Sequence, residues 1–139
     1  MAQDPPTLDA ISVVQEVYGA FGRGDIPAIL GKLAPDVVWA VEGREGDYPT
    51  FGTRHGPDGA LAFFQALGVT EDITAFEPET FHPSGDTVLV QGRIGLTLKA
   101  NGKTLDYPWV HIFTVRDGMV ANFRELYDTA LVVEAYRSR

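Results

Sequence analysis

The stretch that decides the fold is residues 88–127, which read VLVQGRIGLTLKANGKTLDYPWVHIFTVRDGMVANFRELY. Apolar and polar residues alternate along it with period two, as in strands that have one buried face. Asn101-Gly102 and Asp117-Gly118 interrupt the alternation, and both dipeptides favour tight hairpin turns. The stretch therefore predicts consecutive antiparallel strands, part of a meander of about four that begins near Val69.

The residues before this stretch predict helices and one strand. Apolar residues recur at helical spacing over 8–21, with Thr7 as the expected cap, and Asp25 caps a shorter second helix. Residues 37–41 (VVWAV) predict a strand, and a third helix is expected over 56–68. Helices that come first, followed by antiparallel strands, indicate an α+β domain with helices on one face of the sheet.

The composition indicates one globular domain over residues 1–139, in which 1–6 form a loose tail. Apolar residues make up 45% and charged residues 22%, with a net charge of −8 and no cysteine. This acidity argues against nucleic-acid and membrane partners, and no apolar run approaches a membrane span. The N-terminus does not resemble a signal peptide and disulfides are excluded, so a cytoplasmic protein is expected.

His111 and Glu125 are the strongest candidates for chemistry. They flank the Asp117-Gly118 turn at nearly equal distances, so they are expected to be cross-strand neighbours on one face. Met119, Ala121, Phe123 and Tyr127 are expected on that same face. An imidazole beside a carboxyl group within an apolar face suits general acid/base chemistry.

Each candidate also has a structural interpretation. His111 could be a core histidine bonded to a backbone carbonyl. Glu125 could reach water or pair with Arg54, Arg93 or Arg124. Asp128 is better explained as the cap of a final helix than as a site residue. The other two histidines are interpreted as a loop and a surface residue, and the spacing of the three predicts no metal site.

Residues 42–54 are expected to be a loop, and the stretch from Gly43 to Gly52 within it to be a flap. Its glycines provide hinges, and its two aromatic rings, Tyr48 and Phe51, could close over an apolar ligand. We therefore expect a mobile flap at the mouth of a pocket.

Taken together, the chain resembles the ketosteroid-isomerase-like superfamily, also called nuclear transport factor 2-like (NTF2-like), and within it the SnoaL-like polyketide cyclase branch. The resemblance rests on the order and spacing of several short segments: residues 13–25, 33–39 (LAPDVVW), 55–60 (HGPDGA), 111–113 (HIF), 117–120 (DGMV) and 127–128 (YD). It implies a cone-shaped, strongly bent antiparallel sheet, three helices against it, a short C-terminal helix and a deep pocket.

The resemblance also indicates that the catalytic mechanisms of two other branches of the superfamily are not expected in this chain. The catalytic tyrosine of steroid isomerases aligns with Val17 and their carboxylate base with Val41, so that mechanism is not expected. The Arg-x-Asp arrangement of limonene-epoxide hydrolases is broken, because Gly95 follows Arg93 at the critical spacing. By similarity to the cyclase branch, the acid falls on Glu125 and the neighbouring histidine on His111.

The expected function is cofactor-independent acid/base catalysis of the cyclase, isomerase or dehydratase (lyase) kind on a hydrophobic cyclic or polyketide-like substrate. Glu125 would move a proton at carbon, and His111 would stabilise the enolate oxygen. The alternatives are a non-catalytic domain that binds a hydrophobic ligand, and a purely structural dimerisation module. The expected ligand-binding residues are Trp39, Val41, Tyr48, Phe51, Phe63, Trp109, Phe113, Phe123 and Tyr127.

A homodimer is the expected assembly. The outer face of the sheet mixes apolar and polar residues, an arrangement that favours a covering partner. The residues expected there are Gln91, Arg93, Thr97, Val110 and Ile112.

Overall fold

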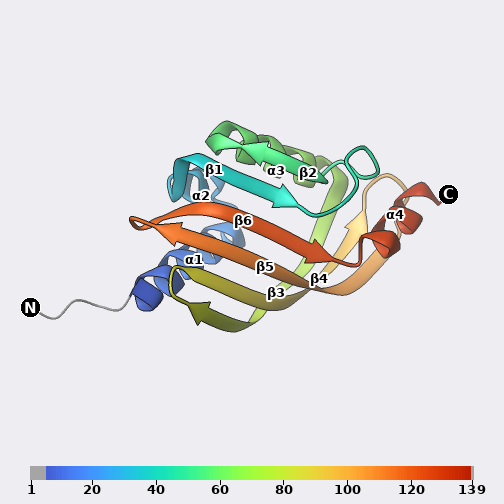
Figure 1. The fold of residues 1–139 in the computed structure, drawn as a ribbon. Helices are drawn as coiled ribbons and strands as arrows, with labels where there is room; N and C mark the ends of the chain where they lie inside the picture. The colour runs from blue at the N-terminus through green and yellow to red at the C-terminus, as the bar shows by residue number, and fades with distance from the viewer. Residues whose placement is uncertain (1–5, 139) are drawn as a thin grey trace, which may run out of the picture.

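A computed structural model describes residues 6–138, and a bent six-stranded sheet forms its centre (Figure 1). The strand order is β2-β1-β6-β5-β4-β3, and all neighbours are antiparallel except β1 and β6, which run parallel. The strands are β1 (Leu33–Val41), β2 (Gly52–His55), β3 (Glu71–Ser84), β4 (Thr87–Leu98), β5 (Thr104–Arg116) and β6 (Met119–Tyr127). The α+β class and the bent sheet are confirmed, with the refinement that the sheet is mixed.

Three helices cover one face of the sheet, and a fourth lies at its end (Figure 1). They are α1 (Pro6–Gly22), α2 (Ile26–Leu30), α3 (Gly56–Thr70) and α4 (Thr129–Arg137). The Asp25 side chain caps α2 by accepting from the Ala28 N–H at 3.1 Å, as predicted. The prediction of Thr7 as a cap was wrong, because α1 already includes it. Most of the expected N-terminal tail, residues 1–5, lies outside the described residues.

The Asp117-Gly118 turn closes the β5–β6 hairpin. Both residues have positive φ (53° and 74°), as a type I′ turn requires. Val115 lies opposite Val120, but Thr114 lies opposite Asn122, so Ala121 is an extra residue in β6. Because of this β-bulge, the side chains of β6 that face inward change from even-numbered positions before it to odd-numbered positions after it.

The short strand β2 was not predicted from the sequence. It overlaps the end of the segment expected to be a loop and pairs antiparallel with β1, with Trp39 opposite Arg54. Its four residues alternate between half-buried and exposed, and none is a large apolar residue. Such a strand leaves almost no hydrophobic pattern in the sequence, and its pairing with β1 defines it.

Candidate active site

His111 and Glu125 face one another across β5 and β6. The ladder pairs them directly, and His111 Nε2 lies 2.8 Å from Glu125 Oε2. The bulge at Ala121 sets this pairing, because without the extra residue Arg124 would lie opposite His111. The predicted cross-strand pair is thus present, although no feature of the sequence indicates the bulge that produces it.

Because of the bulge, the first residues of β6 do not all lie on the face that the sequence predicts. Val120 and Phe123 are buried, whereas Met119 and Ala121 lie on the opposite side, in a surface depression. The expected placement of Met119 and Ala121 on the pocket face was therefore wrong. Beyond the bulge the predicted parity holds, so Phe123, Glu125 and Tyr127 all line the cavity.

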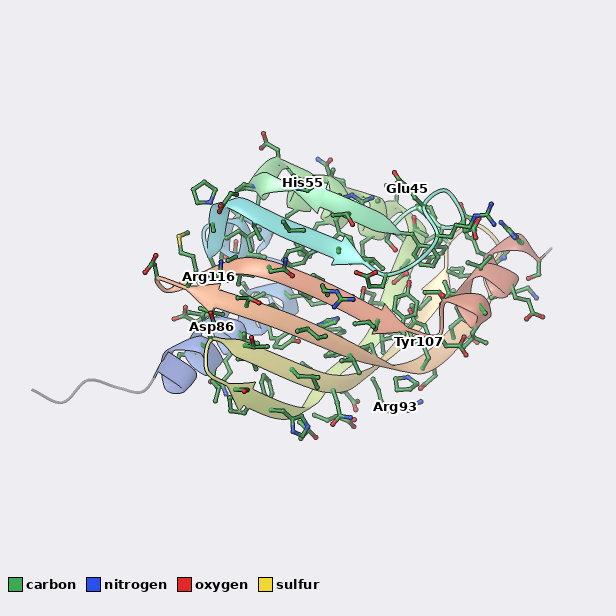
Figure 2. The ribbon with its side chains drawn as sticks, in the orientation of Figure 1. Glu45, His55, Asp86, Arg93, Tyr107 and Arg116 are labelled. Atoms are coloured by element: carbon green, nitrogen blue, oxygen red, sulfur yellow. The ribbon has the colours of Figure 1, made fainter. Side chains whose placement is uncertain are left out.

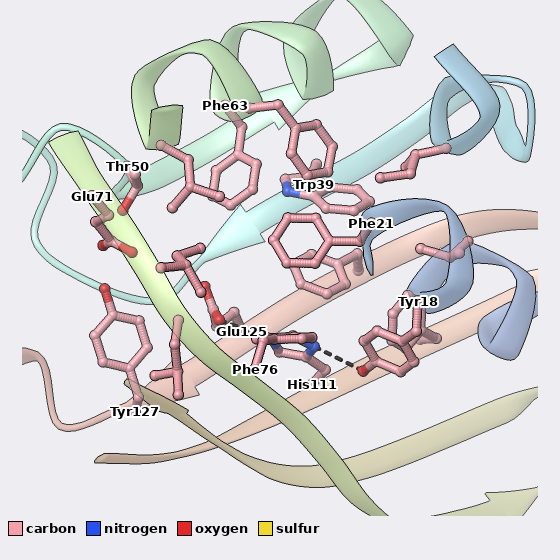
Figure 3. Close-up of a pocket in the computed structure, with 18 of the residues that line it drawn as sticks. Tyr18, Phe21, Trp39, Thr50, Phe63, Glu71, Phe76, His111, Glu125 and Tyr127 are labelled. Carbon is pink, nitrogen blue, oxygen red and sulfur yellow. Dashed lines mark hydrogen bonds and ion pairs between the residues drawn. The ribbon is translucent and has the colours of Figure 1, made fainter. Parts of the chain in front are cut away.

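Tyr18 of α1 completes a hydrogen-bonded chain with this pair. Its hydroxyl lies 2.9 Å from His111 Nδ1, and the two rings stack with centroids 5.9 Å apart (Figure 3). Both ring nitrogens of His111 therefore have side-chain partners, and the ring is only 5% exposed. The alternative of a histidine bonded to a backbone carbonyl is not what the structure shows.

Within residues 6–138, no arginine pairs with Glu125, and the adjacent Arg124 pairs with Glu42 at 3.1 Å. Arg54 donates to backbone carbonyls of residues 49–50, and Arg93 pairs with Asp106 on the outside of the sheet (Figure 2). Among the described residues, His111 is the ion-pair and hydrogen-bond partner of the Glu125 side chain, which is 17% exposed. Its other oxygen is free to meet a ligand.

An apolar cavity of about 60 Å³ lies between the sheet and α1–α3. This free space accommodates a few water molecules, so a ring-containing ligand would have to displace wall side chains. The walls are mostly aromatic, and the polar groups are few (Figure 3). The polar side chains that line it are Tyr18, Thr50, Glu71, Tyr107, His111, Glu125 and Tyr127.

The structure divides the expected ligand-binding residues into two groups. Trp39, Phe63, Phe113, Phe123 and Tyr127 line the cavity. Val41, Tyr48, Phe51 and Trp109 are buried but do not line it, so their expected placement is corrected.

Trp109 is excluded from the cavity because its ring is held between two others. It stacks on His111 with centroids 3.9 Å apart and on Phe76 with centroids 5.0 Å apart. Its outer edge lies against Gly92, which has no side chain to obstruct it. Trp109 therefore supports the His111 ring from behind.

Tyr48 and Phe51 are packed inside the protein rather than over the cavity mouth. Their rings contact each other, and the Tyr48 ring packs edge-on against Tyr136 of α4 at 5.0 Å. The segment reaches the cavity through Thr50 instead. The predicted placement of these two rings at the mouth was wrong, whereas the mobility of the segment stays a prediction.

Glu71 is the main site residue that the sequence analysis missed. It is the first residue of β3, is 7% exposed, and accepts a 2.6 Å hydrogen bond from the Tyr48 hydroxyl. Burial raises the pKa of its carboxyl to about 7, and the charge of Glu125 adds to the rise, while the Tyr48 hydrogen bond opposes it. A glutamate that follows a helix end carries no signal for such burial.

In the sequence, Tyr18 belongs to the apolar residues that recur at helical spacing over 8–21, and its spacing does not indicate a site residue. The resemblance placed Val17 at the position of the tyrosine of steroid isomerases, and the structure shows that the adjacent Tyr18 provides a cavity hydroxyl. Burial, with the charge of Glu125, raises the pKa of Tyr18 well above its usual value. Its phenol therefore keeps its proton at neutral pH.

The remaining polar candidates lie outside the cavity. The Asp128 side chain accepts from the Leu131 N–H at 3.2 Å, which confirms its role as the cap of α4. His55 is exposed at the start of α3 (Figure 2), and His82 is an exposed residue bonded to Gln91. Residues 6–138 contain no cluster of three or more His, Asp or Glu side chains arranged to hold a metal.

Comparison with known proteins places the chain in a family. Residues 14–123 match the model of the SnoaL-like domain. An NTF2-like protein from Burkholderia xenovorans is 30% identical with a TM-score of 0.85, over 94% of this chain and 98% of that one. TerC, co-crystallised with polyporic acid, is 28% identical with a TM-score of 0.81, over 94% and 99%.

A protein from Xanthomonas campestris described as a putative polyketide cyclase shares the fold at 23% identity and a TM-score of 0.75, over 94% and 98%. No curated protein sequence matches the chain. None of the helices in the described part has the length and apolar character needed to cross a membrane. The family match and the similarity over nearly the whole chain lead to one conclusion: the chain belongs to the SnoaL-like domain family of the NTF2-like superfamily.

Proposed function

We propose that the protein is a cofactor-independent enzyme that moves a proton at carbon in a hydrophobic cyclic or polyketide-like substrate, in a cyclase, isomerase or lyase reaction. The observation that carries the proposal is the chain from Tyr18 through His111 to Glu125 in the wall of an apolar cavity. A carboxylate and a phenol at the two ends of one imidazole suit coupled acid/base work.

Glu125 is assigned the role of base. The His111 N–H holds one carboxylate oxygen, and the other faces the cavity, where few water molecules compete for it. A C–H next to a carbonyl group would give its proton to this oxygen, and the electron pair would move to the carbonyl oxygen as an enolate. The resulting acid then returns the proton to carbon, or to a leaving oxygen in the lyase case.

Tyr18 is assigned to the enolate oxygen, with His111 acting through it. In the imidazolium form, His111 donates from Nε2 to Glu125 and from Nδ1 to the Tyr18 oxygen. This arrangement leaves the phenol proton free for a ligand oxygen. It revises the expected direct contact between His111 and the enolate, because both ring nitrogens already have partners.

The substrate class is supported by the cavity walls and by the relatives. Rings from α1, α3 and the sheet enclose the polar chain, as an apolar ring system requires. TerC was co-crystallised with polyporic acid, and other structural relatives are described as polyketide cyclases or isomerases. The alternative is a non-catalytic domain that holds a hydrophobic ligand in the same cavity.

The proposal is tested by hydrogen exchange at carbon. We would incubate 2-tetralone in D₂O with the protein and follow loss of the α-proton signals by NMR. Glu125→Gln should retain tetralone binding, measured by tryptophan fluorescence. Its exchange rate, after subtraction of the rate in buffer, should be about 10²–10⁴-fold lower than that of the wild type. Glu79→Gln, which changes an exposed carboxyl on β3, is the control and should match the wild type. Binding with exchange at the buffer rate would favour the binding domain.

A further inference from the structure

The cavity has a second polar end that the proposed chemistry does not use. Glu71, Thr50 and Tyr127 lie together at one end, while Tyr18 and His111 occupy the other (Figure 3). Any ligand long enough to span the cavity must therefore satisfy polar groups at both ends, since a buried polar atom without a partner is costly.

Glu71 is the group at this end with an unused oxygen. Its Oε2 accepts from Tyr48, and no other hydrogen bond of its carboxyl is formed within residues 6–138. The side chain is more than nine-tenths buried and lines the cavity. Oε1 is therefore the atom available to a ligand.

No cation compensates Glu71 in the described part of the chain. Arg54 donates to backbone carbonyls of residues 49–50, and Lys99 donates to the carbonyl of Gly68. A buried carboxyl without a cation favours its neutral form, which carries a proton. Because Oε2 is the acceptor of the Tyr48 bond, the acid proton would sit on Oε1 and point to the ligand.

From this geometry we infer that Glu71, as a neutral acid, donates a hydrogen bond to a second oxygen of the substrate. The inference rests on the proposed function and narrows the substrate class. The substrate is a flat apolar ring system with two oxygen functions at opposite ends, one for Tyr18 and Glu125 and one for Glu71.

The groups that face Glu71 determine how this contact depends on pH. Tyr48, Tyr107 and Tyr127 all have pKa values raised well above the usual range, mainly by burial, so they stay neutral through pH 8. Glu125 contributes a negative charge that favours the neutral form of Glu71. The donor is therefore present below about pH 7 and is lost as the pH rises through that value.

The test compares trans-2-decalone, which has one carbonyl oxygen, with trans-decalin-2,6-dione, which has a carbonyl oxygen at each end. Ketone oxygens can only accept hydrogen bonds, so a preference for the dione reports a donor in the protein. We expect the wild type at pH 6, followed by tryptophan fluorescence, to bind the dione about tenfold more tightly, as one additional hydrogen bond would provide. Glu71→Leu should bind the two ketones with equal affinity. Glu79→Gln, which changes an exposed carboxyl on the same strand, is the control and should keep the preference.

Glu71→Gln provides a second measurement that does not depend on the leucine variant being folded. The amide retains an acceptor for Tyr48 and a donor for the ligand, so the preference for the dione should persist without pH dependence. In the wild type the preference should fall between pH 6 and pH 8, because the ionised carboxylate cannot donate to a ketone oxygen. The inference is overturned if Glu71→Leu prefers the dione as strongly as the wild type does, or if the wild-type preference is constant with pH. Failure of the wild type to bind trans-2-decalone at all would refute the proposed function as well.

Discussion

Replacing Gly92 with alanine should damage both the fold and the site. A Cβ at this position would overlap Trp109 Cζ2 and would lie 2.5 Å from the backbone carbonyl oxygen of Glu77. The clash with Glu77 cannot be relieved by a rotamer change, because β3 and β4 pair at this point. The Trp109 ring must also move, and it is the ring on which His111 stacks.

The size of the effect follows from two opposing contributions. Overpacking of a core costs about 1–3 kcal/mol, and here both a backbone atom and an indole ring are displaced. Replacing glycine in a strand recovers about 0.5–1 kcal/mol. Because two obstacles are present at once, the upper end of the overpacking cost applies, and we expect a net loss of about 2 kcal/mol in the free energy of unfolding, or ~6–8 °C in Tm for a chain of this size.

Gly95→Ala is the matched control on the same strand. Its Cβ would meet Thr74 Oγ1 at 3.3 Å and Ala75 Cβ at 3.6 Å, so a shift of a few tenths of an ångström accommodates it. Urea unfolding followed by fluorescence should show Gly95→Ala within about 0.5 kcal/mol of the wild type. If Gly92→Ala is as stable as Gly95→Ala, the packing described for Trp109 is incorrect.

Further changes test other parts of the structure. Asp128→Ala should cost about 1 kcal/mol by removing the cap of α4, measured by urea unfolding, and should leave tetralone exchange unchanged, which a site role would not allow. The folded-state pKa of Glu71 is raised from 4.5 to about 7, so its contribution to stability is fully present below pH 4.5 and is lost as the pH rises through 7. Relative to Glu71→Gln, the wild type should lose about 3 kcal/mol between pH 4.5 and pH 8, and parallel pH profiles would contradict this. His111→Ala should lower the free energy of unfolding by about 2–4 kcal/mol, because it empties space beside Trp109 and leaves two polar partners unpaired. A thermal unfolding Tm equal to that of the wild type would contradict the hydrogen bonds of His111 to Tyr18 and Glu125. We also expect a homodimer through the outer sheet face around Val110 and Ile112, which light scattering would refute by showing a monomer at all concentrations.

The long hairpins could be predicted from the sequence because their signals are local. Alternation over 88–127 and the glycine turns place β4, β5 and β6, and they bring His111 close to Glu125. The bulge at Ala121 could not be predicted, because the identity of an alanine does not determine whether it is paired or extra. It is nevertheless the bulge that directs Glu125, and not Arg124, toward His111.

The other half of the site depends on contacts between distant elements. Glu71 is buried because Tyr48, 23 residues earlier, reaches it from the 42–51 segment. Tyr18 bonds to His111, 93 residues away, because α1 crosses the sheet at that point. Neither residue differs in its local sequence from an ordinary core or surface residue. Such partnerships become visible only when the helices are placed on the sheet.

The most direct test of the central claim is nitrogen NMR of the His111 ring. The chain has three histidines, so the His111 signals are assigned by their loss in His111→Ala. If Tyr18, His111 and Glu125 form one hydrogen-bonded chain, Tyr18→Phe should shift the Nδ1 resonance and Glu125→Gln should shift the Nε2 resonance, each leaving the other nitrogen less affected. If Tyr18→Phe leaves the Nδ1 resonance unchanged and Glu125→Gln leaves the Nε2 resonance unchanged, the hydrogen bonds from Tyr18 through His111 to Glu125 are not formed in solution. The proposed acid/base site is then wrong.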